Sequence, residues 1–129
     1  MLTMFARSSC PITNALDIFG DKWTLLVIRD LVLGKKRYLE FTSSPEKITS
    51  NILADRLERL QASDIVTRHA YQHNPVRYEY VLTNKGESLR PILKTIASWG
   101  LEHFPGTMVF AQSGNTKHRQ NYDASKNWF

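Results

Sequence analysis

The strongest constraint on how this chain folds is a change in hydrophobic pattern near residue 64. Before it, TSNILADRLERLQ (49–61) carries apolar side chains at helical spacing, so that one face is Leu53, Leu57 and Leu60. After it, IVTRHAY and RYEYVLT are rich in β-branched and aromatic residues, and the polar QHNPV separates them. Two such runs around a short turn predict a β-hairpin. An amphipathic helix therefore leads directly into a hairpin.

Helix-ending residues divide the first part of the chain. A helix beginning at Pro11, where proline suits the first turn and a preceding serine the cap, is expected to run to about Phe19 and to stop at Gly20. Asp21 can cap a second helix, DKWTLLVIRDLVLG, which Gly34 closes. Because this helix is apolar on most sides, we expect it at the centre of the core.

A helix-turn-helix is predicted next. YLEFTSS (38–44) forms its short first helix, and Thr49 or Ser50 caps the amphipathic helix. The residues between them, SSPEK, suffice only for a turn. Beyond the hairpin, Thr83 caps a last helical stretch, NKGESLRPILKTIASWGLEHF, which Pro91 should kink or restart.

Length and composition predict one globular domain. The chain has 129 residues, 42% hydrophobic and 22% charged, which is ordinary for a folded soluble protein. We expect a flexible N-terminus at 1–7, the folded domain at 8–104 and a poorly ordered polar tail at 105–129. The sequence shows no signal-peptide pattern, and no apolar run nears the roughly 20 residues that span a bilayer. Its single cysteine cannot form an internal disulfide, so we expect a cytoplasmic protein without a membrane segment.

The charge favours a polyanionic partner. Seventeen Lys and Arg against twelve Asp and Glu give a net charge of +5 at pH 7. The excess extends over the helix-turn-helix and hairpin, where eight basic residues face five acidic ones between residues 35 and 77. This local excess is modest, and it lies where a nucleic-acid-binding surface is expected.

The element order predicts a mainly α-helical fold with a β-hairpin, a winged helix-turn-helix. In that fold the second helix of the turn enters the major groove of double-stranded DNA, which is about 12 Å wide. The hairpin is the wing and lies along the DNA backbone or the minor groove. The residues expected to approach bases or phosphates from the amphipathic helix are Thr49, Ser50, Asn51, Ala54, Asp55, Arg56 and Arg59. Those expected at the backbone or minor groove are Lys36, Arg37, His73, Asn74 and Arg77.

An ordinary solvated helix face is the alternative interpretation of the same residues. The hairpin that follows favours the DNA-binding interpretation, because several levels of pattern then agree. Asp55 and Glu58 oppose simple attraction to phosphate. They either hold Arg56 and Arg59 in place or accept hydrogen bonds from cytosine.

The sequence resembles the HxlR-type family of bacterial winged-helix transcriptional regulators, which are related to MarR-like proteins. The matching pieces, from about Ser9 to His103, are CPITNALDIFGDKWTLLVIRDLVLGKKRYLEF, ITSNILADRLERLQASDIVTR and VRYEYVLTNKGESLRPILKTIASWG. The family usually has glycine before the first wing strand, where this chain has Asp64, a residue type that tolerates the left-handed conformation at some cost. The tail is longer than the family core requires.

The resemblance implies a homodimer that binds a roughly palindromic operator and regulates a neighbouring gene. Its interface is formed by the first and last helices, and the residues expected there are Ile12, Leu16, Ile96 and Trp99. Two-fold dimers read half-sites about one helical turn apart, which agrees with this expectation.

Cys10 has two interpretations. Many family members carry a cysteine before the proline, and in some it senses oxidants or electrophiles, often through a disulfide between subunits. Its place at a helix N-terminus, with Arg7 nearby in sequence, could lower the pKa of the thiol. The alternative is a small residue packed in the dimer interface. The signal is therefore open: an oxidant, a small molecule, or none.

Other functions have weaker support. His69 and His73 lie on a strand and its loop, so a shared metal site is not expected, and no cofactor is expected either. Tyr71, Tyr78 and Tyr80 are expected to pack the hairpin on the core rather than to stack on bases. No nucleophile elbow or phosphate-binding glycine loop indicates an enzyme. A winged-helix module for protein interaction, without specific DNA binding, is the remaining alternative.

Overall fold

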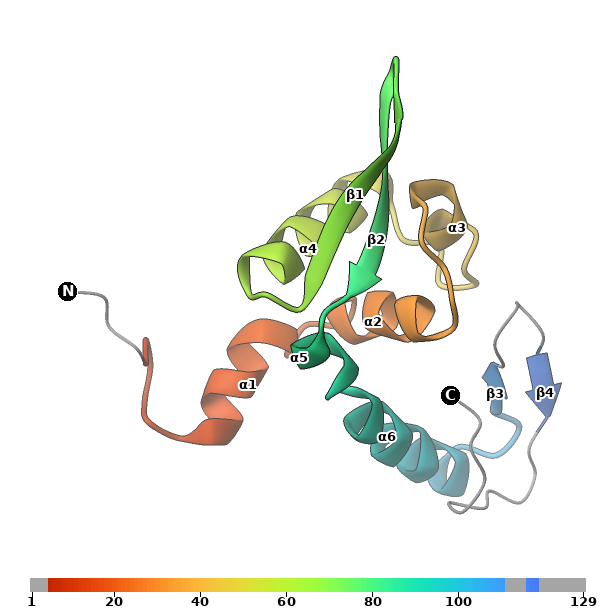
Figure 1. The fold of residues 1–129 in the computed structure, drawn as a ribbon. Coiled ribbons are helices and arrows are strands. Elements are labelled where there is room, and N and C mark those ends of the chain that lie inside the picture. Colours follow the sequence, from red (N-terminus) through yellow and green to blue (C-terminus); the bar gives the residue numbers. More distant parts are fainter. Residues whose placement is uncertain (1–4, 111–115, 119–129) are drawn as a thin grey trace.

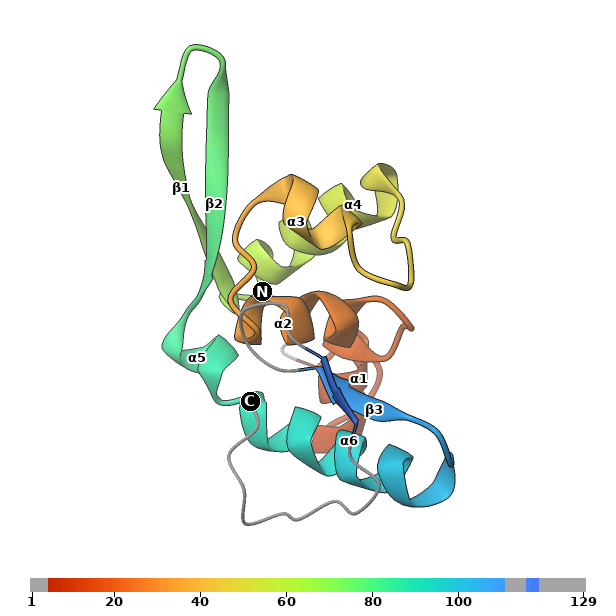
Figure 2. The same cartoon turned by 90° about the vertical axis from the view of Figure 1, so that its right-hand side faces the viewer.

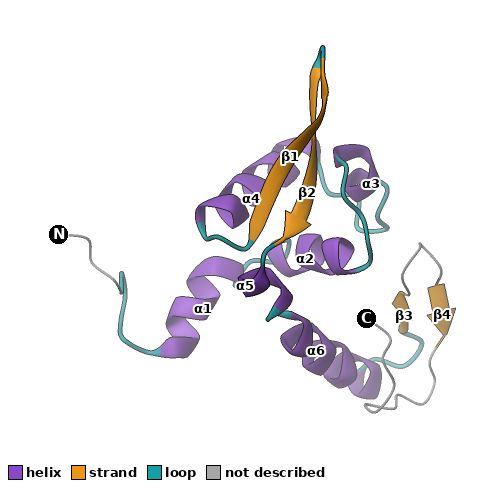
Figure 3. Cartoon of the chain, viewed as in Figure 1, coloured by secondary structure: helices purple, strands orange, loops and turns teal. Residues whose placement is uncertain are grey.

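The computed structural model describes residues 5–110 and 116–118 (Figure 1). The helices and the hairpin follow one another in the order that the sequence predicted, which confirms the winged helix-turn-helix (Figure 3). The elements are α1 (Pro11–Phe19), α2 (Thr24–Val32), α3 (Tyr38–Thr42), α4 (Ser50–Ala62), β1 (Val66–His73), β2 (Val76–Leu82), α5 (Asn84–Glu87), α6 (Arg90–His103), β3 (Met108–Phe110) and β4 (Thr116–His118).

The core forms where α2 meets α4 and the base of the wing. Ile28 of α2, Phe41 of α3 and Leu53 of α4 are each 0% exposed. Val27, Val32, Leu57, Leu60, Ile65, Val66, Tyr80, Leu89 and Leu93 belong to the same buried cluster. The predicted central position of α2 is confirmed, because its apolar residues lie around most of its circumference.

The helix ends follow local chemistry. The side chains of Thr49 and Thr83 accept hydrogen bonds from the backbone N–H groups of Ile52 and Gly86, so both predicted threonine caps are confirmed. The predicted serine cap of α1 is wrong. Cys10 is the N-cap residue, and Ser8 instead accepts a hydrogen bond from the Cys10 backbone N–H at 3.2 Å.

Pro91 restarts the last helical stretch rather than kinking it. The short α5 ends at Glu87, and α6 begins at Arg90 with the proline in its first turn. Gly86 lies so close to the start of the wing that an added Cβ would be 2.3 Å from the carbonyl oxygen of Ile65. Glycine is therefore required where α5 packs on the wing.

The wing is an antiparallel pair, with Val66 opposite Leu82 and His73 opposite Val76. Its register shifts between Ala70 and Gln72. The chain before α3 joins the base of the wing, since Arg37 forms a bridge with Glu79 and the Tyr80 N–H donates to the Lys36 carbonyl oxygen. Asp64, before β1, has a φ of 61°, so it adopts the left-handed conformation expected at that position.

The molecule has two ends. The wing, α3 and α4 lie at one end and α1 and α6 at the other, in both views (Figures 1 and 2). Beyond α6, β3 pairs with β4 in an antiparallel arrangement that the sequence did not predict. The predicted flexible N-terminus and poorly ordered tail fall largely on residues 1–4, 111–115 and 119–129, outside the described residues. These boundaries stay predictions.

Candidate nucleic-acid interface

The outer face of α4 is polar and accessible. The buried leucines Leu53, Leu57 and Leu60 fix the orientation of the helix, so the opposite residues point outward. Ser50, Asn51, Ala54 and Glu58 are exposed there, whereas Asp55 is half-buried. Small and amide side chains in the first turns allow close approach to another surface and leave hydrogen-bonding groups available.

Asp55 is one of two acidic residues on this face, and it pairs with two arginines. Asp55 pairs with Arg59 one turn along at 3.0 Å and also with Arg56. Of the two roles considered for Asp55, holding the arginines is thus the one that the structure supports. Arg59 remains exposed beyond this contact.

Arg56 lies away from the outer face. Its guanidinium Nε donates to Asp21 at 2.9 Å, and its side chain is only 17% exposed. Partial burial disfavours the charged form of Asp21, but hydrogen bonds from Thr24, Arg56 and the Trp23 backbone outweigh it and hold the pKa of this carboxyl well below its usual range. Arg56 therefore ties α4 to the start of α2, and its guanidinium is not presented on the outer face.

Basic and polar residues from two further segments lie at the same end of the molecule as α4. Lys36 and Arg37 precede α3, and His73, Asn74 and Arg77 belong to the tip and second strand of the wing; all five are exposed. A groove of about 490 Å³ separates α3 from the wing, and Arg37 and Arg77 both line it. These sequence-predicted residues thus come from separate segments to one end of the fold (Figure 2).

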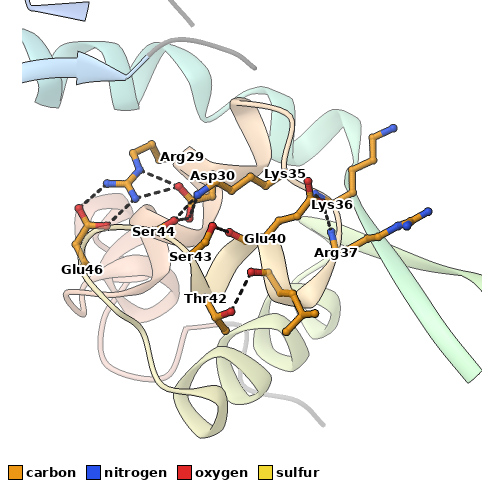
Figure 4. Close-up of polar contacts among 11 residues, drawn as sticks. Arg29, Asp30, Lys35, Lys36, Arg37, Glu40, Thr42, Ser43, Ser44 and Glu46 are labelled. Atoms are coloured by element: carbon orange, nitrogen blue, oxygen red, sulfur yellow. Dashed lines mark hydrogen bonds and ion pairs between the residues drawn. The ribbon is translucent and has the colours of Figure 1, made fainter. Parts of the chain in front are cut away.

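A buried ionic network fixes the helix-turn-helix, and the sequence analysis did not identify it. Asp30 of α2 is 4% exposed and accepts hydrogen bonds from Arg29 and from Ser44. Arg29 also forms a bidentate pair with Glu46 at 2.8 and 2.9 Å, in the turn before α4. Figure 4 shows this network on one side of α3 and Arg37 pointing away from it. Adjacent Arg and Asp in an apolar helix were the signal that could have revealed it.

The tyrosines of the wing have different environments. Tyr80 is buried against Phe41, and Tyr78 packs partly against the core, as expected. Tyr71 is 37% exposed and lies under the guanidinium of Arg37, so the expectation that it packs on the core is wrong. Tyr78 is covered in a similar way by Arg68.

Cys10 is exposed at the N-terminus of α1. Hydrogen bonds from the backbone and side chain of Thr13 and from the backbone of Ile12 lower the pKa of its thiol. Arg7 is not the cause, because its guanidinium pairs with Asp17. The Cys10 thiol is therefore accessible in the protomer and lies in an environment that favours the thiolate.

The opposite end of the molecule exposes large apolar side chains on two helices. Ile12 and Leu16 of α1 are 69% and 48% exposed, and Ile96 and Trp99 of α6 are 49% and 57% exposed. Single exposed apolar residues are common, but several on two helices at one end of a molecule are typical of an interaction surface.

Other kinds of site find little support in the described chain. Within residues 5–110 and 116–118, no group of three or more His, Cys, Asp and Glu is placed to hold a metal ion. The Nε2 atom of His69 lies 3.1 Å from the hydroxyl oxygen of Thr67 on the wing, within hydrogen-bonding distance. Of the helices that the structure describes, none combines the length and apolarity needed to cross a membrane.

The fold and its polar α4 face define a winged helix-turn-helix protein. A profile of the HxlR-like helix-turn-helix family matches residues 18–108, so the chain belongs to that family, as the resemblance indicated. The proteins to which it is similar are transcriptional regulators and not enzymes.

Relatives and solved structures agree with this assignment. Among Bacillus subtilis proteins, the HTH-type regulator YybR is 32% identical over 88% of this chain and 91% of its own length. The HTH-type regulator YodB is 34% identical over 72% of this chain and 84% of its own length. The reduced form of YodB superimposes with a TM-score of 0.62, at 31% identity over 78% of this chain and 99% of that structure. The oxidised form of the redox regulator HypR superimposes with a TM-score of 0.67, at 36% identity over 73% of this chain and 97% of that structure.

Proposed function

We propose that this protein is a cytoplasmic transcriptional regulator that binds double-stranded operator DNA as a homodimer. The observation that carries the proposal is the outward polar face of α4, where Ser50, Asn51 and Ala54 are exposed at the same end of the molecule as the segments that carry the exposed basic residues Lys36 and Arg77. The helix enters the major groove, and the wing lies along the backbone or minor groove. Thr49, Arg59, Arg37, His73 and Asn74 complete the proposed contact set, and Asp55 orients Arg59 within it.

Dimerisation is the second part of the proposal. The exposed apolar residues of α1 and α6 pair with those of a second copy, at the end of the protomer away from α4. Such a dimer presents two copies of α4 to successive turns of DNA. Trp99→Asp should therefore shift the protein from dimer to monomer in analytical ultracentrifugation. A wild-type protein that sediments as a monomer at micromolar concentration contradicts the dimer.

DNA binding is tested by fluorescence anisotropy with the DNA upstream of the protein's own gene and with random DNA, over a salt series. A preference on the order of a thousandfold for the upstream DNA is expected of a specific regulator. Arg77→Ala should weaken binding to both DNAs and reduce the salt slope by about 0.9, the value for one lost phosphate contact. Asn51→Ala should instead narrow the gap between the two DNAs.

The matched control is Arg7→Ala, which removes an exposed arginine near α1 and should leave both affinities unchanged. Weak and equal binding of the wild-type protein to both DNAs would count against the proposal. That result would favour a winged-helix module that binds another protein.

We further propose that Cys10 responds to oxidants. Its exposure and the lowered pKa of its thiol support this, together with the similarity to HypR, which is a redox regulator. The oxidant removes two electrons from two Cys10 thiols, one in each subunit, which lose two protons and form one disulfide. Diamide should therefore change DNA affinity in the wild-type protein and leave Cys10→Ser unchanged. Equal responses of the two proteins would exclude Cys10 as the sensor.

A further inference from the structure

Arg37 is held in place by two side chains of the wing. Its Cζ atom lies 3.8 Å from the centroid of the Tyr71 ring, and its Nε donates to Glu79 at 3.2 Å. A cation over a ring face is attracted by the ring quadrupole, and the hydrogen bond at Nε fixes the in-plane direction. The two contacts together restrict a side chain that would otherwise sample many rotamers.

The position of Tyr71 comes from an irregularity in the wing. The register of β1 and β2 shifts between Ala70 and Gln72, so Tyr71 is the extra residue of a β-bulge. Bulges redirect side chains, and they occur next to functional sites more often than elsewhere. The ring of Tyr71 does not pack in the core, so core packing does not explain why the strand has a bulge at this residue.

One edge of the Arg37 guanidinium stays available. Nε is engaged by Glu79, whereas the two Nη groups form no hydrogen bond with any residue that the structure describes, and the side chain is 51% exposed. Arg37 lines the groove between α3 and the wing, across which lies Arg77. Paired N–H donors in a fixed plane match the oxygens of a phosphate.

We infer that Tyr71 is a positioning residue, which holds Arg37 so that its Nη edge meets a phosphate of the DNA backbone beside the wing. The inference rests on the proposed function. It assigns Tyr71 an effect on DNA affinity that passes through Arg37, and not through stacking of the ring on a base. The β-bulge places the Tyr71 ring against Arg37, and the hydrogen bond to Glu79 fixes the same guanidinium in one orientation.

A double-mutant cycle measured by fluorescence anisotropy tests the inference. It uses the full chain, the upstream DNA and a salt series. Arg37→Ala should weaken binding about tenfold, as expected for the loss of a charge-assisted hydrogen bond, and should lower the salt slope by about 0.9. Tyr71→Ala should weaken binding about three- to fivefold, the range of an exposed cation–π contact. Tyr71→Phe keeps the ring and is the matched control, with affinity near that of the wild type.

The decisive comparison is Tyr71→Ala in the Arg37→Ala background, where the tyrosine substitution should have no further effect on affinity or salt slope. A full additional loss there would show that Tyr71 contacts the DNA itself and would overturn the inference. Wild-type affinity for Tyr71→Ala would also overturn it and leave the proposed function intact. Absence of DNA binding by the wild-type protein would overturn both. Circular dichroism melting of each variant verifies that the fold is retained.

Discussion

Replacing Asp30 by alanine should destabilise the protein strongly, because this carboxylate is buried among cationic partners. Its Oδ1 accepts hydrogen bonds from Arg29 Nε at 3.1 Å and Nη2 at 2.9 Å, and its Oδ2 accepts one from Ser44. Lys35 Nζ lies 3.7 Å from Oδ2. The substitution leaves these donors facing a small apolar side chain inside the protein.

The magnitude follows from the partners that remain. Removing one member of a buried ion pair typically costs about 3–5 kcal/mol. Arg29 keeps its bidentate pair with Glu46, and Lys35 is 23% exposed and can reach water, so the lower end applies. We expect a loss of about 3 kcal/mol in the free energy of unfolding. At roughly 4 °C per kcal/mol, the melting temperature should fall by about 12 °C.

Urea unfolding at one fixed protein concentration is the appropriate assay, because the proposed dimerisation makes the apparent stability depend on concentration. Asp17→Ala is the matched control. It removes the same side chain from an exposed pair with Arg7, and exposed pairs contribute only about 0–1 kcal/mol. If the two substitutions destabilise the protein equally, the network does not stabilise the helix-turn-helix as argued.

Three further predictions concern stability. Gly86→Ala should cost about 1–3 kcal/mol in urea unfolding, since the added Cβ would meet the Ile65 carbonyl oxygen; an unchanged midpoint would contradict this packing. Despite partial burial, hydrogen bonds from Thr24 and Arg56 lower the pKa of Asp21 in the folded protein. They therefore stabilise the fold fully above the unfolded pKa of about 4, and this stabilisation is lost as the pH falls from that value towards the lower folded pKa. Asp21→Asn should accordingly flatten the fall in stability between about pH 5 and pH 2, and an unaltered profile would refute that role. Asp64→Gly should change the unfolding free energy by no more than about 1 kcal/mol, in the stabilising direction, because glycine adopts the left-handed conformation without strain; clear destabilisation would mean that the Asp64 side chain has another role.

The sequence by itself determined the helices and the wing of the helix-turn-helix domain and their order, but not the β3–β4 pair beyond α6. Three signals identified the domain's elements: the helical spacing of the leucines in α4, the alternating pattern of β2, and the threonine caps at 49 and 83. Each depends only on residues that are close together in the sequence. Such interactions are local, so they can be recognised in the sequence without knowing the fold. The left-handed backbone of Asp64 was expected instead from the resemblance, because the family usually has glycine at that position.

The tertiary structure alone decided which partner each arginine takes. Arg56 meets Asp21, 35 residues earlier, and Arg37 meets Glu79, 42 residues later. A long flexible side chain reaches several partners of similar energy, and only the packing of α2, α4 and the wing determines which is close. The burial of Asp30 and the exposure of Tyr71 have the same origin. Sequence pattern therefore predicted the face of α4 that points outward, whereas the fold decided which cationic side chains remain exposed.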